Sequence, residues 1–118
     1  MIIKKDGLEK FNEGVPRAGK GTIINYRYLS ESDMKNKTTG FFVNELMPNS
    51  EIGIHEHVGN EEVYFILSGK AIVNDNGLVA EVGAGDLIFT ESGKTHGMKN
   101  IGEEPLKFVA FIVNLWEK

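Results

Sequence analysis

The feature that most constrains this chain is a succession of short β-rich runs separated by Gly, Asn, Asp and Ser. Outside a single helical turn predicted at residues 30–35 and capped by Ser30, no stretch of ten residues has a helical period. We predict strands at 22–29, 40–47, 51–57, 62–67, 70–74, 78–82, 86–90, 96–100 and 106–114. Many short strands at this spacing are typical of an all-β sandwich or barrel.

Two turn signals support the all-β prediction. Asn76 and Gly77 form the dipeptide preferred in two-residue hairpins, because both residues tolerate positive φ. The stretch 83–86 predicts a second turn before a short apolar strand. A chain of 118 residues is one domain's length, so we predict a single domain over 1–118. It comprises an N-terminal arm at about 1–21 and a barrel at about 22–114.

Composition excludes several classes of protein. The net charge of −4 argues against a nucleic-acid-binding protein, which normally has a basic face. The loose basic group at 17–20 is interpreted as part of a solvated arm. With no cysteine in the chain, any metal must be held by nitrogen and oxygen ligands. No signal-peptide h-region or membrane-length apolar stretch is evident, so the expected location is the cytoplasm.

Two of the predicted strands, at 63–67 and 106–113, are apolar at both parities apart from Lys107. Because side chains alternate between the two faces of a strand, both faces of these strands are expected to be covered. One face belongs to the interior. We favour a partner subunit or the N-terminal arm as the element that covers the other face of these strands. The alternative is that one of the chain's own loops covers it. A homodimer is therefore predicted.

The three histidines of the chain are His55, His57 and His96. In a strand, residues i and i+2 share a face, so His55 and His57 can converge on one ion. Glu62 follows a short loop, and we expect its strand to return antiparallel alongside the first. His96 begins a distant strand, which we expect to supply a ligand from the facing sheet. Taken alone, a His-x-His pair is more often structural than metal-binding.

The spacing of these residues resembles the two motifs of the cupin superfamily. The first motif, H-x-H-x4-E-x6-G, is matched by His55, His57, Glu62 and Gly69. The second is matched by Gly85, Gly93, His96 and Asn100. Two positions depart from the pattern: Asn49 replaces an opening glycine, and Glu91 replaces a proline. Asparagine tolerates positive φ, so the turn at Asn49 is expected to survive.

The resemblance implies an all-β, conical cupin barrel, a double-stranded β-helix or jelly roll. Inside it, His55, His57, Glu62 and His96 would bind one divalent transition metal. Three imidazoles and a carboxylate suit Mn, Fe, Co, Ni, Cu or Zn rather than Ca or Mg. Four protein ligands would leave one or two positions open on a five- or six-coordinate ion, or would close a tetrahedral structural zinc site.

Strand parity places further side chains in the predicted pocket. Tyr64 and Ile66 share parity with Glu62, and Met98 and Asn100 share parity with His96. Tyr64 is the acid/base candidate among them, although a phenol is a poor base near neutral pH. Arg27, on an early strand, is a candidate anchor for an anionic substrate, with a plain surface role as the alternative.

These residues support two functions. The first is a small metalloenzyme of dioxygenase, decarboxylase, isomerase or lyase type acting on a polar, oxygen-rich small molecule. The second is a non-catalytic module that binds or senses a metal or small molecule. A metal site of this kind does not choose between them. A DNA-binding regulator is disfavoured, since the chain has no room for a helix-turn-helix.

Overall fold

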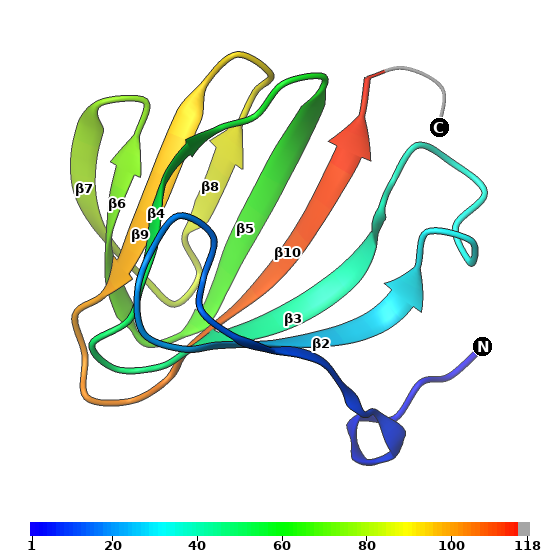
Figure 1. Cartoon of the computed structure of the whole chain (residues 1–118). Coiled ribbons are helices and arrows are strands. Elements are labelled where there is room, and N and C mark those ends of the chain that lie inside the picture. The colour runs from blue at the N-terminus through cyan, green and yellow to red at the C-terminus, as the bar shows by residue number, and fades with distance from the viewer. Residues whose placement is uncertain (116–118) are drawn as a thin grey trace.

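The computed structural model describes residues 1–115 (Figure 1); residues 116–118 of the predicted single domain lie outside them. The described chain contains one 3₁₀ turn, η1 (Lys5–Gly7), and ten strands. The strands are β1 (Lys10–Gly14), β2 (Ile23–Ser30), β3 (Gly40–Leu46), β4 (Glu51–Glu56), β5 (Asn60–Ser68), β6 (Lys70–Asp75), β7 (Leu78–Gly83), β8 (Leu87–Thr90), β9 (Thr95–Asn100) and β10 (Leu106–Asn114). No described helix is long and apolar enough to cross a membrane.

The strands form two sheets that face each other (Figure 1). One sheet has six strands in the order β1-β2-β3-β10-β5-β8, and the other has four in the order β4-β9-β6-β7. Neighbouring strands pair antiparallel throughout. This arrangement confirms the predicted all-β jelly roll.

The predicted turns and strands agree with the structure, but the helical turn at 30–35 does not. All nine predicted strands are present with small shifts at their ends. The hairpin turn has positive φ at Asn76 (50°) and Gly77 (95°), and Asn49 also adopts a positive φ of 62°. Strand β2 continues to Ser30, and a tight turn follows. There the Ser30 N–H donates to Asp33 Oδ2 (2.8 Å), and the Asp33 N–H donates to the Ser30 carbonyl (3.1 Å).

The N-terminal arm contains a strand that the sequence pattern did not predict. Strand β1 is almost fully exposed and extends the six-stranded sheet by pairing with β2. Its sequence, KFNEG, has no apolar alternation, because an edge strand is held by backbone pairing rather than by burial. Phe11 nevertheless packs edge-on against Phe42, with the ring centroids 5.6 Å apart.

The hydrophobic core fills the space between the sheets. The six-stranded sheet contributes Ile23, Leu46, Tyr64, Ile66, Ile88, Leu106, Phe108 and Ala110, and the four-stranded sheet contributes Ile52, Ala71, Val73 and Met98. Burying apolar surface is worth about 25 cal/mol per Å², so this cluster supplies most of the drive to bring the sheets together. Beside Ile23, Ile52 and Tyr64 of this cluster, the space between the sheets is not filled and forms a cavity.

The opposite face of the six-stranded sheet is also apolar. Its side chains include Val63, Phe65, Leu67, Leu87, Phe89, Val109 and Phe111, and several are strongly exposed, such as Leu87 (56%) and Phe89 (47%). We call these seven residues the outer apolar face. The N-terminal segment extends the edge of the sheet at β2, and it leaves Phe65 38% exposed.

Candidate metal centre

The four predicted ligands come together where the two sheets meet. His55 lies on β4 and pairs directly with His96 on β9, while His57 follows the end of β4. Glu62 lies on β5, in the other sheet, where it pairs with Thr90 and Ile112. Two expectations were therefore wrong: His96 shares a sheet with His55, and β5 does not pair with β4. It is Glu62 that reaches across from the facing sheet.

The ligand atoms of these four residues form one tight cluster. One atom from each residue lies within 4.8 Å of the other three. Glu62 Oε1 is 3.0 Å from His57 Nε2 and 3.1 Å from His96 Nε2. His96 Nε2 is also 3.1 Å from the Nε2 atoms of both His55 and His57. Three imidazole nitrogens and one carboxylate oxygen thus point at a common centre.

The other ring nitrogen of each histidine has a hydrogen-bond partner. His55 Nδ1 donates to the Gly53 carbonyl (2.8 Å), and His57 Nδ1 donates to Asn60 Oδ1 (2.7 Å). His96 Nδ1 lies 2.7 Å from Thr90 Oγ1. With the proton on Nδ1, neutral His55 and His57 direct Nε2 lone pairs into the cluster. Facing lone pairs repel one another unless a cation lies between them, so the donor set fits a metal ion.

The surroundings of the ligand side chains shift their pKa values and so set their protonation states. Burial raises the pKa of Glu62, but hydrogen bonds from His57 and His96, which require a proton on each Nε2, outweigh burial and bring the pKa to about 2. In that form the Nε2 protons occupy the place that a cation would take. Burial lowers the pKa of His55, and the hydrogen bond to Glu62 raises the pKa of His57. Glu62 is therefore ionised and His55 neutral near pH 7. A proton and a metal ion compete for the same imidazole lone pair.

Tyr64 is the wall of this centre rather than a reactive group. Its ring stacks on His96 with the centroids 4.9 Å apart and the planes at 17°, and it meets Phe108 edge-on at 4.8 Å. Burial, together with the negative charge of Glu62, raises the Tyr64 pKa well above its ordinary value. A neutral phenol of this kind can donate a hydrogen bond but cannot act as a base near pH 7.

The other predicted pocket residues lie elsewhere. Ile66 and Met98 are buried in the hydrophobic core. Asn100 is buried, and its Nδ2 donates to the backbone carbonyls of Leu46 and Glu104 (2.9 Å each), so it fixes a loop. Arg27 is exposed and lies over the Phe11 ring, 4.3 Å from its centroid, outside the cavity that the histidines line.

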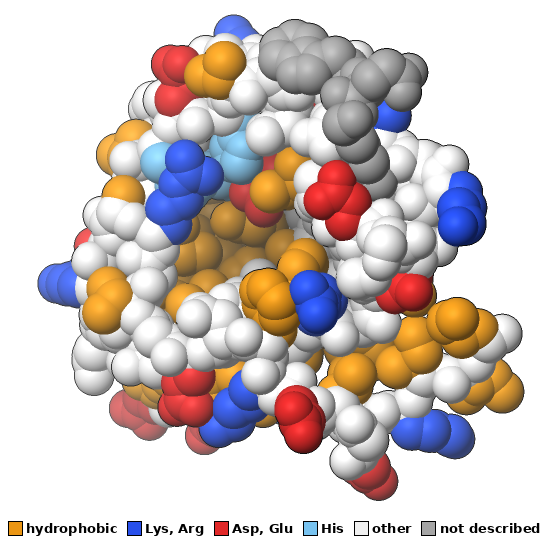
Figure 2. Space-filling view, turned by 45° about the vertical axis from the view of Figure 1, so that its right-hand side comes forward, with side chains coloured by type: hydrophobic (Ala, Val, Ile, Leu, Met, Phe, Trp, Pro, Cys, Tyr) orange, Lys and Arg blue, Asp and Glu red, His pale blue; other side chains and the backbone are white. Residues whose placement is uncertain are grey.

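A cavity of about 380 Å³ opens directly onto the candidate centre. Figure 2 shows it as a hollow with an apolar interior, histidine at the rim and a basic side chain beside the histidine. It is lined by Asn12, Val15, Arg17, Ile23, Asn25, Asn44, Ile52, His55, His57, Glu62, Tyr64 and Ile112. A second cavity, of about 250 Å³, adjoins it and shares Asn25, Asn44, Glu62 and Ile112. The predictions missed Arg17 and the three asparagines.

Replacing Thr90 with valine tests the support of the centre. The change keeps the shape of the side chain but removes the hydroxyl beside His96 Nδ1. We expect metal affinity to fall about 10–100-fold, as is typical when a partner of a ligand histidine is lost. Competition titration with a fluorescent chelator measures it. Thr90→Ser keeps the hydroxyl and is expected to stay within about threefold of the wild type; equal affinities for all three proteins would contradict the role of Thr90.

The comparisons with known proteins agree with this centre. The model of the cupin domain family matches residues 42–112, well over half of the chain. The chain belongs to the cupin family. The oxalate-binding protein of Thermotoga maritima is 40% identical to this cupin over 115 residues, which cover 98% of this chain and 95% of the relative.

Solved structures show the same fold. A crystal structure described as a predicted oxalate decarboxylase from Thermotoga maritima has a TM-score of 0.92 at 35% identity, covering 98% of this cupin and 100% of that chain. The polyketide cyclase RemF from Streptomyces resistomycificus has a TM-score of 0.77 at 18% identity, covering 100% of this cupin and 87% of that chain. The second likeness concerns the fold alone.

Proposed function

We propose that this cupin binds one divalent transition-metal ion (Mn, Fe, Co, Ni, Cu or Zn) and that the ion takes a small carboxylate such as oxalate from the cavity. The observation that carries the proposal is the convergence of three Nε2 atoms and Glu62 Oε1 beside an open cavity. A bound ion would supply Lewis acidity and open positions for carboxylate oxygens. The name of the 40%-identical relative, oxalate-binding protein, supports this ligand class.

Binding without catalysis is the function that the cavity supports best. Apart from the four ligands, Tyr64 is the one described side chain lining the cavity that could transfer a proton. Its raised pKa keeps it protonated near pH 7. A metal-dependent decarboxylase is the second candidate, favoured by the description of the 35%-identical structure. The metalloenzyme predicted from the sequence is thus retained as the alternative.

The experiment that tests the proposal starts with protein purified without added metal. Metal content by ICP-MS is expected to approach one ion per chain, and calorimetry is expected to detect oxalate binding. Stripping the ion with a chelator should abolish the heat of binding, and Mn²⁺ should restore it. Oxalate binding that survives stripping would overturn the metal-dependent assignment. Conversion of oxalate into equal amounts of CO₂ and formate would establish the decarboxylase instead.

The outer apolar face supports a second proposal: two copies of this cupin pair through it. Contiguous exposed apolar patches often mark interaction sites, and four of the seven side chains of this face are at least 38% exposed. A twofold dimer uses the same patch on both subunits. Phe65→Glu at its centre is expected to convert a dimer to a monomer in light scattering. The control, Leu78→Glu, alters a residue that is 69% exposed on β7 of the other sheet and should leave the dimer intact. A wild-type monomer would contradict the proposal.

A further inference from the structure

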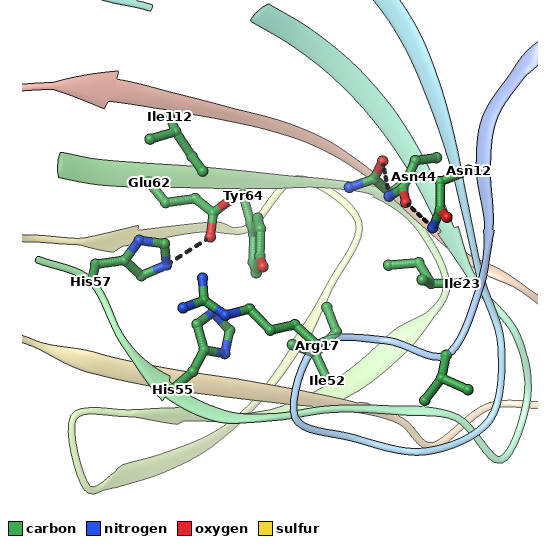
Figure 3. A pocket seen from close by; sticks show the side chains of 12 residues that line it. Asn12, Arg17, Ile23, Asn44, Ile52, His55, His57, Glu62, Tyr64 and Ile112 are labelled. Carbon is green, nitrogen blue, oxygen red and sulfur yellow. Dashed lines mark hydrogen bonds and ion pairs between the residues drawn. The ribbon is translucent and has the colours of Figure 1, made fainter. Parts of the chain in front are cut away.

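The cavity holds one cationic side chain that the metal centre does not use. Arg17 is the single Lys or Arg among the described residues that line it. Figure 3 shows its guanidinium extending over His55 and toward His57. Within residues 1–115 this guanidinium forms no ion pair or hydrogen bond.

The backbone holds Arg17 in this place through an unusually close contact. Arg17 lies in a turn in which the Gly19 N–H donates to the Pro16 carbonyl (3.1 Å) and Ala18 has a φ of 54°. The Gly53 N–H donates to the Arg17 carbonyl (2.9 Å). A Cβ at Gly19 would overlap the Glu51 carbonyl oxygen, and one at Gly53 would overlap that of Ala18. A non-glycine residue at positive φ persists where its surroundings hold it, often at ligand clamps.

The far side of the cavity presents a row of three asparagines. Asn12 Nδ2 donates to Asn25 Oδ1 (2.9 Å), and Asn25 Nδ2 donates to Asn44 Oδ1 (2.8 Å). The row therefore ends in the Asn44 Nδ2 group, which has no partner among the described residues. Asn44 is only 7% exposed, and Figure 3 places it across the cavity from His57. No buried side-chain nitrogen or oxygen of the described residues lacks a partner, so this Nδ2 group is open to the cavity. A ligand oxygen in the cavity can therefore accept its hydrogen bond in place of water.

The size of the cavity indicates a ligand longer than oxalate. Oxalate has six non-hydrogen atoms; at no more than about 30 Å³ each, the liquid volume of a water molecule, they take up less than about half of the space. The cavity measures about 380 Å³, and a second cavity that Asn44 also lines lies beside it. An acid held at the metal end has room for a second polar group at the asparagine end.

Resting on the proposed function, we propose that Arg17 is the anion clamp of this cupin and Asn44 its second anchor. The ligand class is a small organic acid with polar groups at both ends, such as a four-carbon dicarboxylate. Arg17 binds the carboxylate that meets the metal, because a guanidinium matches a carboxylate bidentately and stays charged throughout the physiological pH range. The Asn44 Nδ2 group donates to the carboxylate at the far end.

The test uses Mn²⁺-loaded protein titrated by calorimetry with sodium oxalate and with sodium succinate. Arg17→Ala is expected to weaken both acids about 10–100-fold, the usual effect of losing a charged hydrogen-bond partner. Asn44→Asp keeps the acceptor for Asn25 but replaces the donor with a negative charge. It is expected to weaken succinate at least about tenfold and to leave oxalate within about threefold. Arg27→Ala, an arginine outside the cavity, is the matched control and should change neither.

Several results would overturn the inference. They are an Arg17→Ala protein that binds both acids as the wild type does, an Arg27→Ala protein that loses them, and a wild type that binds oxalate but no succinate. An Asn44→Asp protein that weakens oxalate as much as succinate would remove the second anchor. Manganese content of every variant, measured by ICP-MS, separates the causes. If the Arg17→Ala protein holds normal manganese and binds both acids as the wild type does, only this inference is contradicted. If the wild type itself holds no manganese, the proposed function is contradicted as well.

Discussion

Replacing Glu62 with glutamine is expected to lower the metal affinity of this cupin more than about a hundredfold. Glu62 contributes the carboxylate of the cluster, and its lowered pKa of about 2 makes it anionic near pH 7. A neutral amide is a weaker ligand for a transition metal. It also leaves the cation with three neutral nitrogen ligands and no anionic ligand from the facing sheet. ICP-MS after dialysis against a weak chelator measures the loss.

The neighbouring residue offers a matched control for this prediction. Glu61 precedes Glu62 on the same strand but stands outside the cluster. Glu61→Gln makes the same chemical change at the opposite parity and is expected to retain the ion. His57→Ala provides a second test, since it removes a nitrogen ligand and should also remove most of the metal. One ion per chain in Glu62→Gln and His57→Ala alike would refute the ligand assignment.

The second large effect is expected from Phe108→Ala, which removes a fully buried ring from the core. Substitutions of this kind cost about 3–5 kcal/mol in the free energy of unfolding, because they lose apolar burial and leave a cavity. Phe108 also packs edge-on against Tyr64, whose ring stacks on that of His96. Chemical denaturation should therefore show the lost stability, and metal retention should fall with it.

The control for the core substitution is Phe11→Ala. The Phe11 ring is 53% exposed on the edge strand β1 and packs against Phe42. Its removal is expected to cost at most about 1 kcal/mol, within the range of surface substitutions. If Phe108→Ala and Phe11→Ala lower the free energy of unfolding equally, the central place of Phe108 in the core is contradicted.

The sequence predicted the strands and the ligand residues because both depend on local patterns. Alternation and turn residues locate strands within a residue or two, and the motif spacing brings together His55, His57, Glu62 and His96. Which strands share a sheet depends on pairings between distant segments, which no local pattern records. For that reason His96 was expected on the wrong sheet, although its role as a ligand candidate was predicted.

The two arginines show where local reasoning ends. Arg27 lies on a predicted strand and was considered as an anchor, whereas Arg17 lies in an arm without periodicity and was assigned to solvent. The structure brings Arg17 to the cavity through contacts between turn 16–19 and strand β4, more than thirty residues away in the sequence. The signal in the sequence was the pair of glycines at 19 and 53, which allow the turn and strand β4 to approach closely. The pair can be interpreted only once these two segments are known to be in contact.

The turn that carries Arg17 also joins the two sheets. It leads from β1 to β2 in the six-stranded sheet, yet the amides of Lys20 and Glu51 each donate to the other's carbonyl, at 3.0 and 2.9 Å, which ties it to β4 of the four-stranded sheet. Because only these two ladder hydrogen bonds join Lys20 to Glu51, we expect this tie to open at a lower free energy than global unfolding, and hydrogen exchange of the two amides measures it. A bound acid is expected to slow their exchange, and its escape is expected to follow the rate at which this tie opens.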